Sequence, residues 1–360
     1  MYDLLHKMSL LGPFVRNITN TALNRQPSSY LCLLKQLRDT PPNQKISPKI
    51  SVVGAGQVGI SICAFLIQRN LARHLVIHDI RYDWAKAEAL DLLHASCWLK
   101  NPHIEACGDG SHTKDSDIVI VTAGARPVGK DRSRLLVMKK TVEILKLAMP
   151  KLIELSPKAV FVIVSNPADV MTYAIQRICK LEKHRCFTTG CSLDSARFRF
   201  LIAQRLKVPT TEVEGYVIGE HGNSAVPVWS SVTVGGVPLV KVVRDLGTSM
   251  DTENWNNLFK DVTQAGASVG NIKGYTNWAI ALSAVNVVEA MLENSGRILC
   301  LGTDMQGMNS IGQQVVLSLP CKVTSTGISH VLQLPLTALE QEKLHKSAEV
   351  LMKAQCSLEL

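Results

Sequence analysis

The chain has 360 residues, of which 46% are hydrophobic and 19% charged, and its formal net charge at pH 7 is +9. That length holds one large or two medium domains, and the longest apolar runs have the length of strands, which argues against a membrane span. The Lys and Arg residues form no long run, and the ten cysteines show neither zinc-site nor disulfide-framework spacing, so nucleic-acid binding and secretion are not indicated. We expect a globular enzyme with free thiols.

The first 49 residues differ in composition from the rest of the chain. They contain seven Lys or Arg against two Asp, and an apolar stretch from Leu4 to Phe14 is followed by Arg16 and Arg25. This composition is typical of a mitochondrial transit peptide and equally of an arm that contacts another subunit. We treat residues 1–49 as an N-terminal extension, and we expect a cytoplasmic protein unless the extension is a transit peptide, which would make it mitochondrial.

A strand running into G-x-G-x-x-G is the strongest motif of the chain, and it spans Ser51–Gly59. A helix from Ile60 to Asn70 is predicted to follow. A second strand-like run then ends at Asp79, twenty residues after Gly59. A glycine motif with a strand before it, a helix after it and an acid at this distance predicts a dinucleotide-binding βαβ unit.

Each residue of the motif has a physical role in holding a dinucleotide. Gly54 allows the tight turn, Gly56 lets a pyrophosphate approach the backbone, and Gly59 lets the helix pack closely on the sheet. The free N–H groups at the start of the helix attract the phosphates. Asp79 accepts hydrogen bonds from ribose hydroxyls and repels a 2′-phosphate, which favours NAD over NADP, although Arg81 weakens that preference. The predicted cofactor-binding residues of this segment are Gly54, Gly56, Gln57, Val58, Gly59 and Asp79.

From residue 85 to residue 164 the pattern alternates between helix and strand. The predicted elements are a helix over Ala85–Leu99, a strand over Asp117–Thr122, a helix over Ser133–Leu155 and a strand over Ala159–Val164. The strands are continuously apolar, which means that both faces of the sheet are covered. Ligands of such doubly wound parallel sheets bind beyond the carboxyl ends of the strands.

The pattern changes beyond about residue 190, where shorter strands and longer helices are predicted. We therefore expect an α/β fold with a doubly wound parallel (Rossmann) sheet in residues 50–190, followed by an α+β substrate domain in residues 191–360. The last helix opens with a capping box at Thr337. The elements predicted before it are a helix over Ser195–Leu206, strands over Gly215–Ile218 and Val232–Val234, and helices over Leu258–Val269 and Trp278–Asn294.

Polar clusters stand where these strands are predicted to end. Thr122–Arg126 and Ser165–Pro167 each follow a strand, Asp194–Arg197 begins a helix, and Gly219–Gly222 surrounds His221. Each cluster alone has an ordinary interpretation, such as a helix N-cap at the aspartate or a turn histidine. Because all four fall after strands of one sheet or at the domain boundary, we expect them to converge on one site.

Residues 50–360 resemble the L-lactate/malate dehydrogenase family, and most closely its animal L-lactate dehydrogenases. The resemblance implies NAD as cofactor, a small 2-oxo or 2-hydroxy acid as substrate, and a homotetramer that binds neither nucleic acid nor membrane. The segments that carry the resemblance are TAGAR at Thr122–Arg126, VSNP at Val164–Pro167, CSLDSARFR at Cys191–Arg199, IGEHGNSAVPVWSS at Ile218–Ser231, KGYTNWAI at Lys273–Ile280 and LSLPC at Leu317–Cys321.

The reaction of that family suits the residue types found here. A 2-hydroxy acid loses a hydride from C2 and a proton from its hydroxyl, and His221 is the natural base because its pKa lies near neutrality. Asp194 would hold the other ring nitrogen and stabilise the imidazolium. Arg197 offers a planar fork that matches the substrate carboxylate.

The resemblance assigns further roles around this centre. It places Asn166 near the nicotinamide and the substrate oxygen, Thr276 in the substrate pocket, and Arg126 at the cofactor pyrophosphate. The family also has an arginine that polarises the substrate carbonyl. Arg132 and Arg134 are the candidates for it. We choose Arg134, because the helix from that residue onward then matches the lactate dehydrogenase pattern without a gap, and a loop tolerates an insertion better than a helix.

Substrate choice in the family is set by the loop after Arg126. Lactate enzymes resemble one another in having a Gln just after this position and malate enzymes an Arg, whereas this chain has Pro127 and Val128. An apolar Val128 at the substrate favours a neutral 2-oxo acid, so lactate and pyruvate are the predicted pair. Malate is the alternative, since Arg126, Lys130 or Arg132 could swing in and accept the second carboxylate of oxaloacetate. A non-catalytic NAD-binding relative is the other alternative, which the retained histidine, aspartate and arginine disfavour.

Overall fold

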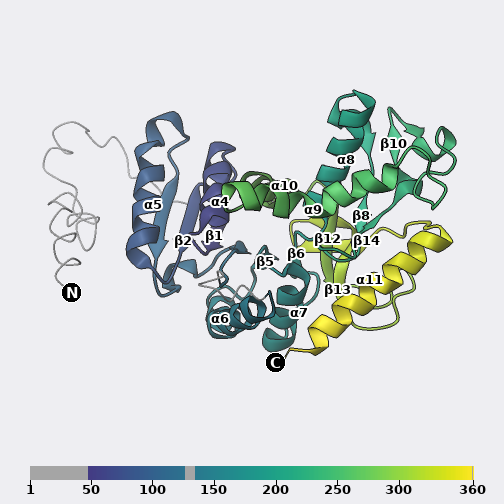
Figure 1. Cartoon of the computed structure of the whole chain (residues 1–360). Helices are drawn as coiled ribbons and strands as arrows, with labels where there is room; N and C mark the ends of the chain where they lie inside the picture. Colours follow the sequence, from purple (N-terminus) through teal and green to yellow (C-terminus); the bar gives the residue numbers. More distant parts are fainter. Residues whose placement is uncertain (1–47, 126–133, 359) are drawn as a thin grey trace, which may run out of the picture. The chain divides into compact units, whose positions relative to one another are not determined.

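The computed structural model describes residues 48–125, 134–358 and 360. Within these residues a nine-stranded sheet runs in the order β14-β13-β12-β6-β5-β4-β1-β2-β3 (Figure 1). The strands from β6 to β3 pair in parallel, whereas β12, β13 and β14 extend the sheet in antiparallel pairing. The strands are β1 Lys49–Val53, β2 His74–His78, β3 His103–Cys107, β4 Ile118–Val121, β5 Val160–Ile163, β6 Cys186–Thr188, β12 Ile298–Asp304, β13 Val316–Thr324 and β14 Gly327–Val331.

Helices cover both faces of the parallel strands, as the doubly wound prediction requires. Every residue of β4 and of β5 is buried, which is why these strands are apolar throughout. In the described part of the chain, no helix combines the length and apolar character needed to cross a membrane. The helices are α4 Gln57–Gln68, α5 Tyr82–His94, α6 Arg134–Leu155, α7 Ala168–Cys179, α8 Ser192–Leu206, α9 Trp255–Lys273, α10 Trp278–Leu292 and α11 Ala338–Cys356.

The sheet itself differs from the prediction at its two edges. At one edge lies β3, which was not predicted. Its polar side chains His103 and Glu105 alternate with apolar ones, but five residues are too few for this alternation to indicate a strand. At the other edge, β12 pairs with β6 through Gly302 and Thr188. Strands from after residue 190 therefore continue the sheet of the first half. The short helix α7 and strand β6 were also not predicted, and the helix expected over Ala85–Leu99 ends at His94.

The second half contains the predicted helices and short antiparallel strands. Two small sheets form, one from β7 Val213–Glu214, β10 Thr233–Val234 and β11 Val237–Pro238, and one from β8 Val217–Ile218 and β9 Val226–Pro227. Aromatic side chains pack beside them, with ring centroids of Phe198 and Trp229 4.7 Å apart and edge to face. The capping box of α11 is confirmed, because Thr337 and Glu340 each accept a hydrogen bond from the other's backbone N–H.

Helix α10 lies beside α4, the helix of the glycine motif (Figure 1). Asn277 donates a buried hydrogen bond of 2.8 Å to Ser61 Oγ. The rings of Trp278 and Phe65 meet edge to face with centroids 6.0 Å apart. These contacts fix the start of α10 on the cofactor-binding unit, and they hold the neighbouring residue Thr276 there as well.

Candidate active site

The turn after β1 has the conformation that the glycine motif predicts. Gly54 has a φ of +104°, and a Cβ on it would lie 2.7 Å from the Ala123 backbone nitrogen. A Cβ on Gly59 would lie 1.9 Å from the carbonyl oxygen of Gly54. Helix α4 has no side-chain cap at Gly56 and no acid in its first turn. Its first N–H groups, which begin at Gln57, are therefore suited to an anionic ligand.

Asp79 follows β2 beside this turn. Its carboxylate accepts hydrogen bonds from the backbone N–H groups of Ala55 and Arg81, both at 2.9 Å. The Arg81 guanidinium also pairs with it at 3.3 Å. Burial alone would raise the pKa of Asp79, but these donors outweigh burial and hold that pKa below its ordinary value. The acid is ionised at the turn, and Arg81 partly neutralises it.

The carboxyl ends of β1, β4 and β5 come together, because these strands are neighbours in the sheet. Thr122 donates to the carbonyl oxygen of Gly54 at 2.9 Å, and Ser165 donates to the carbonyl oxygen of Ala123 at 2.6 Å. Asn166 is exposed beyond β5, and its peptide bond to Pro167 is cis. The two polar clusters that follow β4 and β5 therefore form one continuous edge with the glycine turn.

Asp194 joins a histidine and an arginine. It lies in the first turn of α8, whose N-cap is Cys191, so the aspartate does not cap the helix. Its Oδ2 accepts from Nδ1 of His221 at 2.5 Å, and its Oδ1 accepts from Arg197 at 3.2 Å. Arg197 reaches the carboxylate because residues three apart share a helix face. The structure thus brings together the three residues that the sequence singled out in this region.

The surroundings of His221 favour its charged form. Burial would lower the pKa of this imidazole, but the charge and hydrogen bond of Asp194 outweigh burial and raise it above its ordinary value. The His221 side chain keeps 23% of its surface exposed, whereas Asp194 keeps 6%. With Nδ1 held by the aspartate, Nε2 is the ring nitrogen left for a ligand.

Asp169, in the first turn of α7, is a member of this site that the sequence analysis missed. It is buried, and it accepts the backbone N–H of His221 at 2.8 Å. Its Oδ1 is buried with no hydrogen-bond partner among the described residues. Burial raises the pKa of Asp169 to about 7, against the opposing hydrogen bond from His221. The signal in the sequence was an acid inside the otherwise apolar run that follows Asn166 and Pro167.

The turn that carries His221 is anchored by α11. Ser347 accepts the backbone N–H of Glu220 at 2.8 Å, and the Glu220 carboxylate in turn accepts from Ser224 at 2.5 Å. Gly219 has a φ of +85°, and a Cβ on it would lie 2.6 Å from Ser347 Oγ. The glycine is needed here for its backbone conformation and for the close approach of the helix.

Some predicted site residues are not located by the structure. Arg126, Val128 and Arg132 lie outside the described residues. Arg134 is the first residue of α6. Because Arg132 is not described, the choice between the two candidate arginines remains a prediction. Thr276 is half-buried just before α10.

Comparison with known proteins identifies the family. The model of the lactate/malate dehydrogenase NAD binding domain matches residues 48–188, and that of the lactate/malate dehydrogenase alpha/beta C-terminal domain matches residues 191–357. The L-lactate dehydrogenase B-B chain of Danio rerio is 42% identical over 86% of this chain and 92% of its own length. The Homo sapiens L-lactate dehydrogenase B chain is 41% identical over 89% of this chain and 94% of its own length. The Petromyzon marinus L-lactate dehydrogenase is 40% identical over 90% of this chain and 98% of its own length. The chain therefore belongs to the lactate/malate dehydrogenase family, and it contains that family's NAD-binding domain.

Proposed function

We propose that this protein is an NAD-dependent 2-hydroxy acid dehydrogenase that interconverts L-lactate and pyruvate. The observation that carries the proposal is the joined group of His221, Asp194 and Arg197, which combines a proton-transfer histidine with a carboxylate-binding arginine. The relatives named L-lactate dehydrogenase support lactate as the hydroxy acid. We place the NAD-binding domain in residues 50–190 and the substrate domain in residues 191–360.

The residues of the glycine turn fit NAD. The cradle at Gly54 and Gly59 has no room for a Cβ, and the uncapped start of α4 leaves N–H groups for the pyrophosphate. The turn residues Gly56, Gln57 and Val58 complete this cradle. Asp79 would bind the adenine ribose, and Arg126 would reach the pyrophosphate. When bound, NAD supplies the nicotinamide that accepts the hydride from C2 of the hydroxy acid.

His221 carries the proton in this mechanism. In lactate oxidation its Nε2 accepts the hydroxyl proton, and in pyruvate reduction the imidazolium returns a proton to the carbonyl oxygen. Asp194 holds the ring by Nδ1 and stabilises the imidazolium, which agrees with the raised pKa of His221. Because Asp169 holds the backbone of the same residue, both the ring and the main chain are fixed before substrate binds.

The substrate is held by groups around this histidine. Arg197 gives one N–H to Asp194 and has further donors for the substrate carboxylate. Arg134 would polarise the carbonyl oxygen, and Asn166 would bind near that oxygen and the nicotinamide. Thr276 and Val128 would line the side-chain pocket, where the apolar valine suits the methyl group of pyruvate better than a second carboxylate.

We propose further that the protein is a homotetramer located in the cytoplasm. Trp98, Leu147 and Ile272 are large apolar side chains that are almost fully exposed in the single chain, and contact with other copies would bury such surface.

The nine cysteines of the described residues are all free, which agrees with a reducing compartment. Light scattering tests the first proposal. A fluorescent fusion with and without residues 1–49 tests the second, and mitochondrial import of the long form alone would contradict it.

The decisive experiment is NADH oxidation by the purified chain with pyruvate, oxaloacetate, 2-oxobutyrate and phenylpyruvate offered in parallel. We expect the highest kcat/KM with pyruvate. A preference for oxaloacetate would make this a malate dehydrogenase and would indicate that a basic loop residue pairs with the second carboxylate. If no acid is reduced while NADH still binds, the protein is a non-catalytic NAD-binding relative.

A further inference from the structure

A cluster of histidines surrounds one glutamate at the amino ends of β2 and β3. His74 begins β2 and stands opposite His103, the first residue of β3. Glu105 lies two residues further along β3, on the same face as His103, because side chains alternate along a strand. The register of the two strands therefore gathers three polar side chains on one face of the sheet edge.

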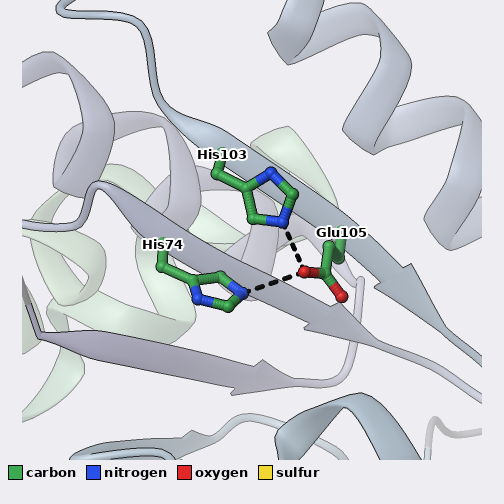
Figure 2. A group of neighbouring side chains, drawn as sticks. All are labelled: His74, His103 and Glu105. Carbon is green, nitrogen blue, oxygen red and sulfur yellow. Dashed lines mark hydrogen bonds and ion pairs between the residues drawn. The ribbon is translucent and has the colours of Figure 1, made fainter. Parts of the chain in front are cut away.

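Both rings of this cluster point at the same carboxylate oxygen, as Figure 2 shows. His74 Nε2 lies 3.0 Å from Glu105 Oε1, and His103 Nε2 bonds the same oxygen. His112, from the turn after β3, lies 2.8 Å from the other oxygen, Oε2. The cluster remains open to solvent, because Glu105 keeps 28% of its side-chain surface exposed.

These side chains are of the types that ligate transition metals in proteins. The ligand atoms of His74, His103 and Glu105 all lie within 4.8 Å of one another. Tetrahedral zinc with bonds of about 2.0 Å separates its ligand atoms by roughly 3.3 Å, so small side-chain rotations would admit an ion. Two imidazoles and a carboxylate are ligands that suit zinc better than calcium or magnesium.

We propose that His74, His103 and Glu105 bind one zinc ion per chain, with His112 orienting the carboxylate through its second oxygen. A water molecule completes the four ligands. The ion would tie the edge strand β3 to β2. Edge strands have one unpaired side and are held by fewer contacts than central strands, so zinc would stabilise this edge.

The proposed zinc site is separate from the proposed active site. Its ligands stand at the amino ends of the strands, whereas Gly54 and Asp79 follow the carboxyl ends of β1 and β2. Neither its ligands nor the test below depends on hydride transfer. The positive charge of Lys49, the register partner of His74 on β1, acts on His74, and its ammonium group donates to the carbonyl oxygen of Lys114 at 2.8 Å.

The test is a zinc titration of the full chain, freed of any polyhistidine tag, stripped with EDTA and dialysed. Calorimetry should show one saturable equivalent, and zinc should raise the midpoint of thermal unfolding, since a ligand that binds only the folded state stabilises it. The double change His74→Ala with His103→Ala should weaken zinc binding by more than about 100-fold, and His112→Ala by about 10- to 100-fold. Cobalt should give the intense visible spectrum of a tetrahedral site.

His184→Ala is the matched control, because His184 is another exposed histidine beside a glutamate, 3.9 Å from Glu182. This variant should bind zinc like the unaltered chain. Glu105→Gln, which keeps the shape of the side chain, serves if the double variant does not fold, and it too should lose the equivalent. Undiminished zinc binding in the ligand variants, no saturable binding, or a sulfur-to-cobalt charge-transfer band that places the ion on cysteine would each overturn the proposal.

Discussion

The His221–Asp194 pair and the His74–His103–Glu105 cluster combine the same side-chain types in opposite surroundings. The side chain of Asp194 is 6% exposed and contacts one imidazole, whereas that of Glu105 is 28% exposed and contacts three imidazoles. The pKa of His221 is raised, because the Asp194 charge outweighs burial. The pKa of His74 is lowered, because burial and the Lys49 charge outweigh Glu105. Burial acts in the same direction on both histidines, so the charges beside them, Asp194 for His221 and Lys49 for His74, account for the opposite pKa shifts.

Replacing His221 should have the largest effect. His221→Ala removes the only ring that Asp194 holds among the described residues, and we expect turnover of pyruvate to fall by about 10²- to 10⁴-fold. NADH binding, followed by nucleotide fluorescence, should remain. His330→Ala changes an exposed histidine of β14 and serves as control. Equal turnover in the His221 variant would remove the role assigned to it.

Asp194→Asn replaces the charged partner of His221 with a neutral amide of the same shape. Loss of the carboxylate charge removes the main cause of the raised pKa of His221, so that pKa should fall. Pyruvate reduction needs the imidazolium, and its kcat/KM should therefore decline at lower pH than in the unaltered enzyme. We expect kcat to drop by about 10²-fold. If kcat/KM declines at the same pH in the variant and in the unaltered enzyme, Asp194 does not set the pKa of the histidine.

Asp169→Asn tests the buried acid behind the site. The folded pKa of Asp169, about 7, lies above the ordinary 3.8, so its contribution to stability is present below pH 4 and is lost as pH rises through 7. The asparagine keeps an acceptor for the His221 N–H but does not titrate. We expect the variant to lose less stability than the unaltered chain between about pH 4 and pH 7, measured by urea unfolding. Parallel pH dependence of the two proteins would contradict the assignment.

Glu105→Gln in metal-free buffer should have the smallest effect. Its partners are partly exposed histidines, and exposed ion pairs contribute about 0–1 kcal/mol. The unfolding free energy should therefore change by less than about 1 kcal/mol. Asp194→Ala, which leaves Arg197 and His221 without their buried partner, should cost about 3–5 kcal/mol in the same assay. Similar costs at both sites would mean that burial does not distinguish them.

Local patterns in the sequence determined the cofactor-binding unit and the central strands. The glycine motif with Asp79 predicted the turn after β1, because the steric need for glycine is a property of a few consecutive residues. The apolar runs of β4 and β5 predicted buried parallel strands. His221 and Asp194 were predicted separately, from glycines around a histidine and an acid at a helix start, and the structure brings them to 2.5 Å.

Tertiary structure alone decided the edges of the sheet and the contacts across it. The antiparallel strands β12–β14 join the sheet through one residue pair, Gly302 and Thr188, which are far apart in sequence. Asp169 reaches the backbone of His221 across 52 positions, and His74 meets Glu105 across 31. Such contacts depend on strand register and helix packing, which bring distant residues together and therefore leave no local pattern for the sequence to display.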